Sequence, residues 1–205
     1  MQFREKTCVR GHRSLEKNVT EIILPHGIGK RRHLSMIKKE NLKQVLLTLD
    51  FIKKAYKEEY VKEWISFDCC ITVDFKNEKI TYPEDKGMII HRKTTCNFSE
   101  PENFVVLECI TSLLDKGYKP EHIELEKPMP GGHDDTGGFC DIQVKDNTGK
   151  TFLLIECKKE NEFEKFWKKT LADGDQLFRY YNSYRSAQAL CLYMSDFTDD
   201  NKLKR

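Results

Sequence analysis

The stretch FCDIQVKDNTGKTFLLIECK, residues 139–158, decides the fold of this 205-residue chain. Two apolar runs, at 139–144 and 151–158, flank a segment at 145–150 that contains Asp, Asn and Gly. Short apolar runs bounded by such turn residues are typical of two β-strands joined in a hairpin. The sequence therefore predicts a hairpin here, and the rest of the chain is arranged around it.

Three charged side chains interrupt this hairpin: Asp141 in the first strand, and Glu156 and Lys158 at the end of the second. A turn that is symmetric about residues 146–149 would place Asp141 opposite Leu154 and diagonal to Glu156. Diagonal neighbours are about 7–8 Å apart at the backbone. Lys158 is two residues beyond Glu156, so strand alternation predicts that it lies on the same face.

Two acids and one ammonium at the end of a sheet suit phosphodiester hydrolysis. A hard divalent ion such as Mg²⁺ takes one or two carboxylates together with water and phosphate oxygens. A neighbouring lysine can hold the attacking water, and the metal neutralises charge on the phosphate. The same spacing also occurs by chance in exposed, charged hairpins. The acids after four apolar residues favour a functional site, because burying them without a purpose is costly.

The flanking sequence predicts an α/β sandwich around a mixed sheet. Before the hairpin, residues 99–102 have a capping-box pattern that opens a helix over FVVLECITSLLDK, which Gly117 ends. After the hairpin, helical sequence extends from about 160 to 184, and the apolar run ALCLYM at 189–194 predicts a buried strand. Further strands are expected at 67–75, 78–82 and 87–91.

The N-terminal region predicts a basic and helical extension over residues 1–65, with the sheet domain at 66–205. Apolar residues recur at three- and four-residue steps from Lys38 to Ile65, which predicts one long amphipathic helix. The basic stretch at 26–39 contains GIGK but lacks the spacing of a phosphate-binding loop, so a basic surface is expected there.

The composition of the chain argues against several classes of protein. With 35 basic and 33 acidic residues the net charge is +2, so any nucleic-acid contact needs a local patch. The eight cysteines contain no CxxC pair, which predicts free thiols of a reducing, cytoplasmic protein. No apolar run is long enough for a membrane helix, and the N-terminus does not look like a secretory signal.

The segment from about Pro101 to Phe197 resembles the PD-(D/E)xK nuclease domain at the N-terminus of type I restriction enzyme R subunits. It also resembles related domains fused to N6-adenine methylases in single-chain restriction-modification enzymes. The last matching piece contains Gln176-x-x-x-Tyr180, similar to the QxxxY motif that follows ExK in this group. The matching pieces, in order, are PENFVVLECITSLLDKGY, GGFCDIQV, LLIECKK and DGDQLFRYYN.

The resemblance implies a restriction-endonuclease-like core, a mixed central sheet flanked by helices, and a metal-dependent endonuclease. Asp141 and Glu156 would bind Mg²⁺, or Mn²⁺ as a substitute, with the backbone carbonyl of Cys157 as an extra ligand. Lys158 would orient and activate the attacking water. Gln176 and Tyr180, which would share a helix face, would support the site or position the DNA backbone. A cysteine, Cys140, stands where the family usually has a proline.

Such nucleases often add an acid from the first helix, and two candidates compete. Glu108 lies on the polar side of the predicted helix, so we expect it to be exposed to solvent. Glu102 lies in the first turn and fits the family's PE pattern, although it may serve only as the acid of the capping box. A second metal cluster at His133, Asp134 and Asp135 is less expected than a solvated loop.

The leading hypothesis is a DNA endonuclease domain of a restriction-modification system. It would act on double-stranded DNA with methylase, specificity or translocase parts, for which the first hundred residues would form a docking surface. The alternative is a non-catalytic DNA-binding or adaptor module on the same fold. A self-sufficient, structure-specific nuclease is disfavoured by the weak net charge.

Overall fold

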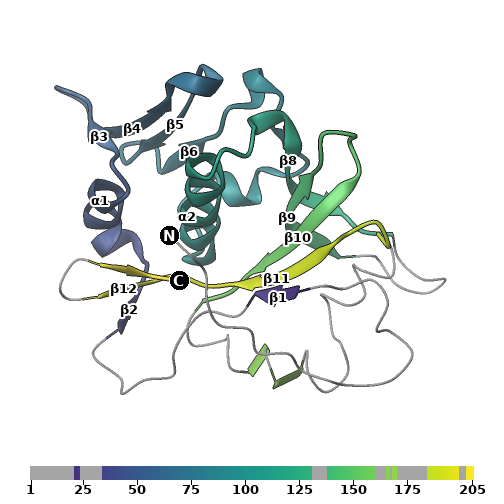
Figure 1. The fold of residues 1–205 in the computed structure, drawn as a ribbon. Coiled ribbons are helices and arrows are strands. Elements are labelled where there is room, and N and C mark those ends of the chain that lie inside the picture. Colours follow the sequence, from purple (N-terminus) through teal and green to yellow (C-terminus); the bar gives the residue numbers. More distant parts are fainter. Residues whose placement is uncertain are drawn as a thin grey trace.

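The computed structural model describes residues 21–23, 34–130, 138–159, 165–166, 168–169, 184–198 and 202–205. Its largest element is a six-stranded sheet of order β1-β11-β10-β9-β8-β7 (Figure 1). The strands are β1 Glu21–Ile23, β7 Ile89–Ile90, β8 Ile123–Pro128, β9 Phe139–Lys145, β10 Thr151–Cys157 and β11 Ala189–Tyr193.

The six-stranded sheet is mixed. Strands β8, β9 and β10 are antiparallel neighbours, whereas β11 is parallel to β10, β1 is parallel to β11 and β7 is parallel to β8. The predicted hairpin at 139–158 and the predicted strand at 189–194 are therefore confirmed, as is an α/β fold with a mixed sheet.

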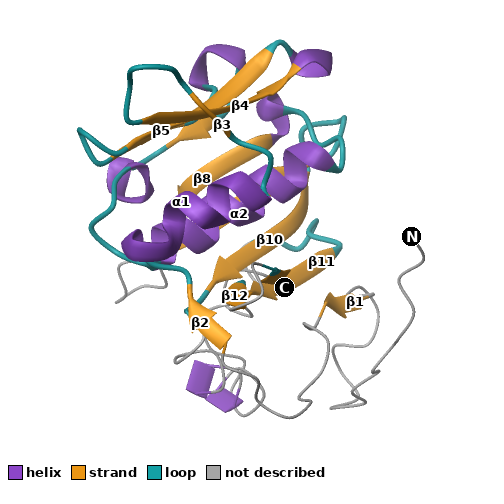
Figure 2. Ribbon diagram, turned by 90° about the vertical axis from the view of Figure 1, so that its left-hand side faces the viewer, coloured by secondary structure: helices purple, strands orange, loops and turns teal. Residues whose placement is uncertain are grey.

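Helix α2, Glu102–Asp115, lies between the six-stranded sheet and a second sheet (Figures 1 and 2). Every residue of this helix from Asn103 to Leu114 is buried. A helix that is apolar almost all round is typically covered on more than one side. The helix ends as predicted, with Gly117 in the left-handed region at a φ of 92°.

The second sheet is antiparallel, in the order β3-β4-β5-β6, and helix α1 packs beside it (Figure 2). A third sheet has the order β13-β12-β2. The strands and helices of these parts are β2 Leu34–Met36, α1 Lys39–Thr48, β3 Ile52–Lys53, β4 Glu59–Trp64, β5 Cys69–Asp74, β6 Lys79–Thr81, β12 Asp196–Thr198 and β13 Leu203–Lys204. Single 3₁₀ turns are η1 Ile65–Phe67, η2 Glu84–Lys86, η3 Lys93–Cys96 and η4 Pro120–His122.

The prediction of one long helix over residues 38–65 is wrong. Helix α1 ends at Thr48, and Asp50 follows with a φ of 64°. The N–H of Asp50 donates to the carbonyl of Leu47 and that of Phe51 to Leu46, which is the Schellman pattern. Phe51 is buried beyond the turn, and the chain then reverses into β3 and β4.

The second half of the predicted helix is instead a strand because it has a partner. All six residues of β4 pair with β5, from Glu59 opposite Asp74 to Trp64 opposite Cys69. Helical propensity is a weak preference, and a ladder that buries side chains on a shared core overrides it.

The expected division of the chain at residue 65 stays a prediction, but the ladder between β4 and β5 runs across it. Strands β1 and β2 also pair with β11 and β12, far along the chain. One apolar core contains Leu46 and Trp64 from the first region together with Phe104 and Ile155 from the second.

Three short strands, the cysteines and part of the helical sequence after the hairpin were also predicted. The strands predicted at 67–75, 78–82 and 87–91 appear as β5, β6 and β7. The seven described cysteines are free thiols, and all except Cys70 are buried. Of the helical sequence expected at 160–184, the described residues 165–166 and 168–169 are helical, and most of the rest lies outside the described residues.

Candidate functional site

The β9–β10 hairpin has a register that differs by two residues from the expected one. Leu154 lies opposite Gln143 rather than opposite Asp141. The ladder extends to Ile155 opposite Ile142, so the next residues toward the open end are Glu156 on β10 and Asp141 on β9.

The shift has two local causes. The N–H of Asp146 donates to the carbonyl of Lys150 at 2.8 Å, so the turn closes one residue later than at Gly149. An irregularity between Thr151 and Leu153 then adds a second residue to β10. A displacement of two residues does not by itself move a strand's side chains to the other face, and the shared face of Asp141 and Glu156 stays a prediction.

Asp141 is held against the end of β10. Its Oδ2 accepts a hydrogen bond of 2.6 Å from the backbone N–H of Cys157. The thiols of Cys140 and Cys157 are both fully buried, in two different apolar clusters. The role of the Cys157 carbonyl as a metal ligand stays a prediction.

Lys158 joins the acids of two elements. Its backbone N–H donates to the carbonyl of Tyr193 on β11 at 2.8 Å, which holds the residue at the end of the sheet. Its Nζ donates to Oε1 of Glu156 at 2.7 Å and to Oε1 of Glu102 at 3.0 Å. The same Nζ lies 4.9 Å from the ring centroid of Phe166, within cation–π range.

Glu102, at the start of α2, therefore belongs to this cluster rather than to a helix cap. The N-cap position is Pro101, which makes no side-chain hydrogen bond to the helix, so the predicted capping box is wrong. The backbone N–H of Ser99 instead binds the side chain of Asn97. The Glu102 carboxylate points to Lys158, where it is about a quarter exposed (27%).

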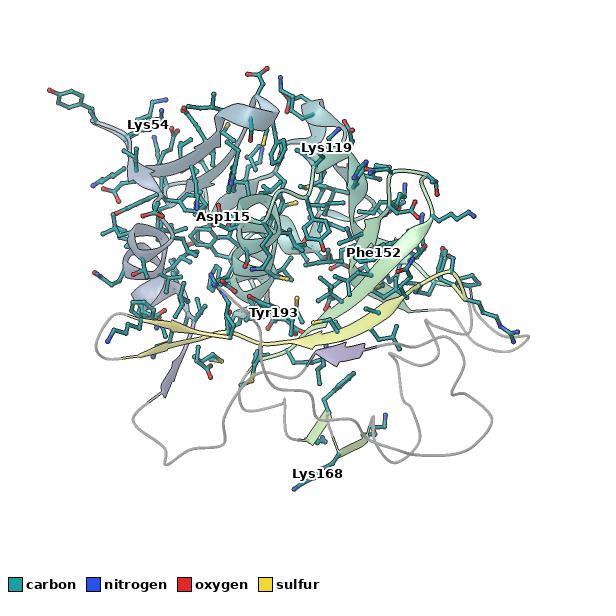
Figure 3. All side chains as sticks on the ribbon, viewed as in Figure 1. Lys54, Asp115, Lys119, Phe152, Lys168 and Tyr193 are labelled. Atoms are coloured by element: carbon teal, nitrogen blue, oxygen red, sulfur yellow. The ribbon has the colours of Figure 1, made fainter. Side chains whose placement is uncertain are left out.

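The expectation that Glu108 is exposed is also wrong. The side chain is fully buried and accepts hydrogen bonds from the Tyr193 hydroxyl and from Nε of Arg205. Tyr193, labelled in Figure 3, lies on β11, the strand that also binds the backbone of Lys158. The polar side of α2 faces other protein groups because the helix is covered on more than one side.

The carboxyl groups of Asp141 and Glu156 are close to one another and largely shielded from water. Burial and the charge of Glu156 hold the pKa of Asp141 well above its ordinary value, against the opposing effect of Lys158. Burial likewise raises the pKa of Glu156 to about 7, although Lys158 favours its ionised form. Burial acts to lower the pKa of Lys158, but the charges of Glu156, Asp141 and Glu102 outweigh it and raise that pKa.

One carboxylate oxygen of this cluster has no hydrogen-bond partner among the described residues. Oε2 of Glu156 is buried and forms no hydrogen bond within the described residues. A buried, unsatisfied carboxylate oxygen is costly, and a bound ion is one explanation for such a group. The oxygen donors of Asp141 and Glu156 are of the kind that Mg²⁺ prefers, so the residues fit such an ion. Among the described residues, however, no three His, Cys, Asp or Glu side chains are already grouped as a ligand set.

A fourth acid, Glu126 on β8, was missed by the sequence analysis. Its side chain is buried, at 9% exposure, and its backbone has a φ of 51°. The charge of Glu126 also acts on Glu156, where it favours the protonated form and so helps to raise the pKa. Alternation of apolar and charged residues in IELEK, from Ile123 onward, is the strand signal that would have located it.

The remaining predicted site residues are not placed. Gln176 and Tyr180 lie outside the described residues, as do His133, Asp134 and Asp135. Most of the basic stretch at 26–39 is outside them as well.

Comparison with known proteins adds no assignment: no family model matches the chain, and no curated protein matches it. In the described part of the chain, no helix combines the length and the apolar character that crossing a membrane requires. The candidate site therefore stands on its own residues.

Proposed function

We propose that this chain is a metal-dependent DNA endonuclease domain of the PD-(D/E)xK type, from a type I or type I-like restriction-modification system. The observation that carries the proposal is the convergence of Asp141, Glu156 and Lys158 at the open end of one hairpin. Helix α2 precedes this hairpin and contributes Glu102, and the parallel strand β11 holds the backbone of Lys158. The proposed enzyme is cytoplasmic and acts on double-stranded DNA.

Asp141 and Glu156 would hold Mg²⁺ or Mn²⁺, with the Cys157 carbonyl as a further ligand. When bound, the ion supplies charge neutralisation on the phosphate and lowers the pKa of a bound water. The protein residues position these groups before DNA arrives. The N–H of Cys157 fixes the Asp141 carboxylate, and Lys158 fixes one oxygen of Glu156.

Lys158 acts in this scheme as a hydrogen-bond donor. Three nearby carboxylates raise its pKa, so it remains an ammonium at neutral pH and cannot itself accept a proton. An ammonium at this point can orient a water molecule or bind a phosphate oxygen. Glu102 keeps the ammonium at the site through its 3.0 Å contact with Nζ.

The alternative, a non-catalytic DNA-binding or adaptor module, also has an observation in its favour. Lys158 already pairs with Glu156 and Glu102, and a site that never holds a metal would need such an internal counter-charge. The raised pKa of Asp141 and the unpaired oxygen of Glu156 favour the endonuclease, because an internal ion pair alone leaves both groups poorly compensated.

The direct test is nicking of supercoiled plasmid by the full chain in Mg²⁺ or Mn²⁺. We expect Lys158→Ala to reduce nicking by roughly 10²-fold or more, the usual cost of losing a preorganised donor at a developing charge. The matched control is Lys150→Ala, which removes an exposed lysine from the turn of the same hairpin.

Equal nicking by the wild type and Lys158→Ala would refute the assigned site. If the isolated chain nicks nothing, the same pair of variants is tested in the assembled restriction system. DNA cleavage there that survives Lys158→Ala would favour the non-catalytic module.

A further inference from the structure

Three acidic residues occupy neighbouring backbone positions on three adjacent strands, although the described His, Cys, Asp and Glu side chains do not already form a ligand group of three. The ladder between β8 and β9 pairs Leu125 with Ile142 and Lys127 with Cys140, so Glu126 falls opposite Asp141. On the other side of Asp141, Ile155 pairs with Ile142, so Glu156 is the next residue of β10 beyond this pair, as Asp141 is on β9. We call Glu126, Asp141 and Glu156 the carboxylate row. Adjacent strands are only about 4.8 Å apart, and like charges directly opposite one another destabilise a sheet.

The charge of the row is not balanced by the described side chains. Lys158 contacts Glu156 and, outside the row, Glu102. Glu126 forms no hydrogen bond or ion pair within the described part of the chain, although its side chain is more than nine-tenths buried. Buried ionisable groups are ordinarily paired or bound to metal, so an unpaired one needs an explanation.

Glu124, two residues earlier on the same strand, shows how this fold treats a structural acid. It is almost fully buried and is paired with His91, Lys127 and Lys145. Burial opposes its ionisation, but hydrogen bonds from these three groups outweigh burial and lower its pKa to about 2. Among the described residues, the structure thus provides basic partners for Glu124 and none for Glu126.

The backbone at Glu126 also departs from an ordinary strand. A strand residue other than glycine rarely has a positive φ, and such strain is held only where the surroundings impose it. At Glu126 the φ of 51° breaks the alternation of β8, and Lys127 pairs with Glu124 on the strand at 2.7 Å. The adjacent lysine thus contacts Glu124, and no contact between it and Glu126 is found among the described residues.

We propose that Glu126 supplies a third strand-borne carboxylate to the divalent-cation site, beside Asp141 and Glu156. The inference rests on the cation site of the proposed function and adds a residue from β8 to it. Glu126 would raise the affinity of the site for a divalent cation, either as a ligand or through a bound water, because three acids repel one another until a cation joins them.

The test is calorimetric titration of the full chain with Mn²⁺, without DNA. We expect Glu126→Gln to weaken Mn²⁺ binding roughly 10-fold to 100-fold, the range seen when groups supporting a metal site are removed. Glu156→Gln should weaken it at least as much. The control is Glu121→Gln, the same chemical change at an exposed acid just before β8.

The outcomes separate the inference from the function on which it rests. If Glu126→Gln binds Mn²⁺ like the wild type while Glu156→Gln does not, the inference is wrong and the cation site stands. If Glu156→Gln also binds like the wild type, or the wild type does not bind, both the inference and the proposed function fail.

Thermal unfolding in EDTA distinguishes a cation-binding role of Glu126 from a purely structural role. Removing one of three mutually repelling acids should leave the melting temperature unchanged or raise it, and Mn²⁺ should then stabilise the variant less than the wild type. A second variant, Glu126→Asn, removes the charge with a residue that tolerates positive φ. Unfolding of both variants in EDTA would make Glu126 a structural residue and overturn the inference.

Discussion

At the scale of single residues, the environment of a carboxylate decides its role. Glu102 and Glu108 lie six positions apart on α2, yet Glu102 reaches Lys158 and Glu108 is buried under Tyr193. Glu156 is different again, because Lys158 binds one of its oxygens and the other is unpaired. Residue type alone does not separate these cases, and the neighbouring elements do.

The raised pKa of Glu156 predicts a pH dependence of stability in metal-free buffer. The ordinary pKa of 4.5 rises to about 7 in the folded protein. An acid with a raised folded pKa contributes stability that is fully present below pH 4.5 and is lost as pH rises through about 7. We expect the free energy of unfolding in EDTA to fall across this window, and to fall less in Glu156→Gln, which does not titrate.

Urea denaturation at a series of pH values across the window measures this effect. Glu121→Gln, which changes an exposed acid, should follow the wild type. Parallel curves for wild type and Glu156→Gln would show that Glu156 titrates in the folded protein as it does in the unfolded chain.

At the scale of elements, short backbone motifs set where helices stop. Helices α1 and α2 end with the same hydrogen-bond pattern, with Asp50 and Gly117 in the left-handed position. Glycine adopts this conformation without steric cost, whereas aspartate does not. The stop after α1 is therefore harder to recognise from sequence than the stop after α2.

Asp50→Gly should stabilise the protein. Relief of the left-handed conformation is worth about 1 kcal/mol, and it outweighs the added freedom of the unfolded chain. The measurement is the urea midpoint of the full chain. Asp85→Gly is the matched control, because Asp85 is exposed and has no positive φ, so glycine there should destabilise. Equal effects of the two substitutions would contradict the assignment of strain to Asp50.

At the scale of the whole molecule, distant parts of the chain share one core. Leu46 and Trp64 pack in the same apolar cluster as α2 and β10. Trp64 also donates from its indole to Asp115 of α2 at 2.9 Å. The described residues of this first region are thus part of the folded unit, whatever further docking role the region has.

Deleting residues 1–65 should therefore prevent folding. The deletion removes β1, β2, α1, β3 and β4, leaves β5 without its β4 partner, and exposes the apolar face of α2. Circular dichroism during urea denaturation should show no cooperative transition for the truncated chain. A cooperative transition like that of the full chain would contradict this prediction. Docking of partner subunits is better tested by substitutions at exposed residues.

The sequence by itself determined the elements whose signals are local. The hairpin at 139–158, helix α2 and strand β11 each follow from apolar periodicity bounded by turn or stop residues. The contact between Glu156 and Lys158 was also predictable, since residues two positions apart on a strand lie on the same face.

Only the tertiary structure decided what depends on distant partners. The register of the hairpin depends on the irregularity between Thr151 and Leu153. The strand that replaces the second half of the predicted helix depends on β5, and the burial of Glu108 depends on its contact with Tyr193. The backbone of Glu126 comes near that of Asp141 because β8 pairs with β9. Pairing and burial energies between elements outweigh local preferences of a few tenths of a kcal/mol per residue, and one sequence window does not contain them.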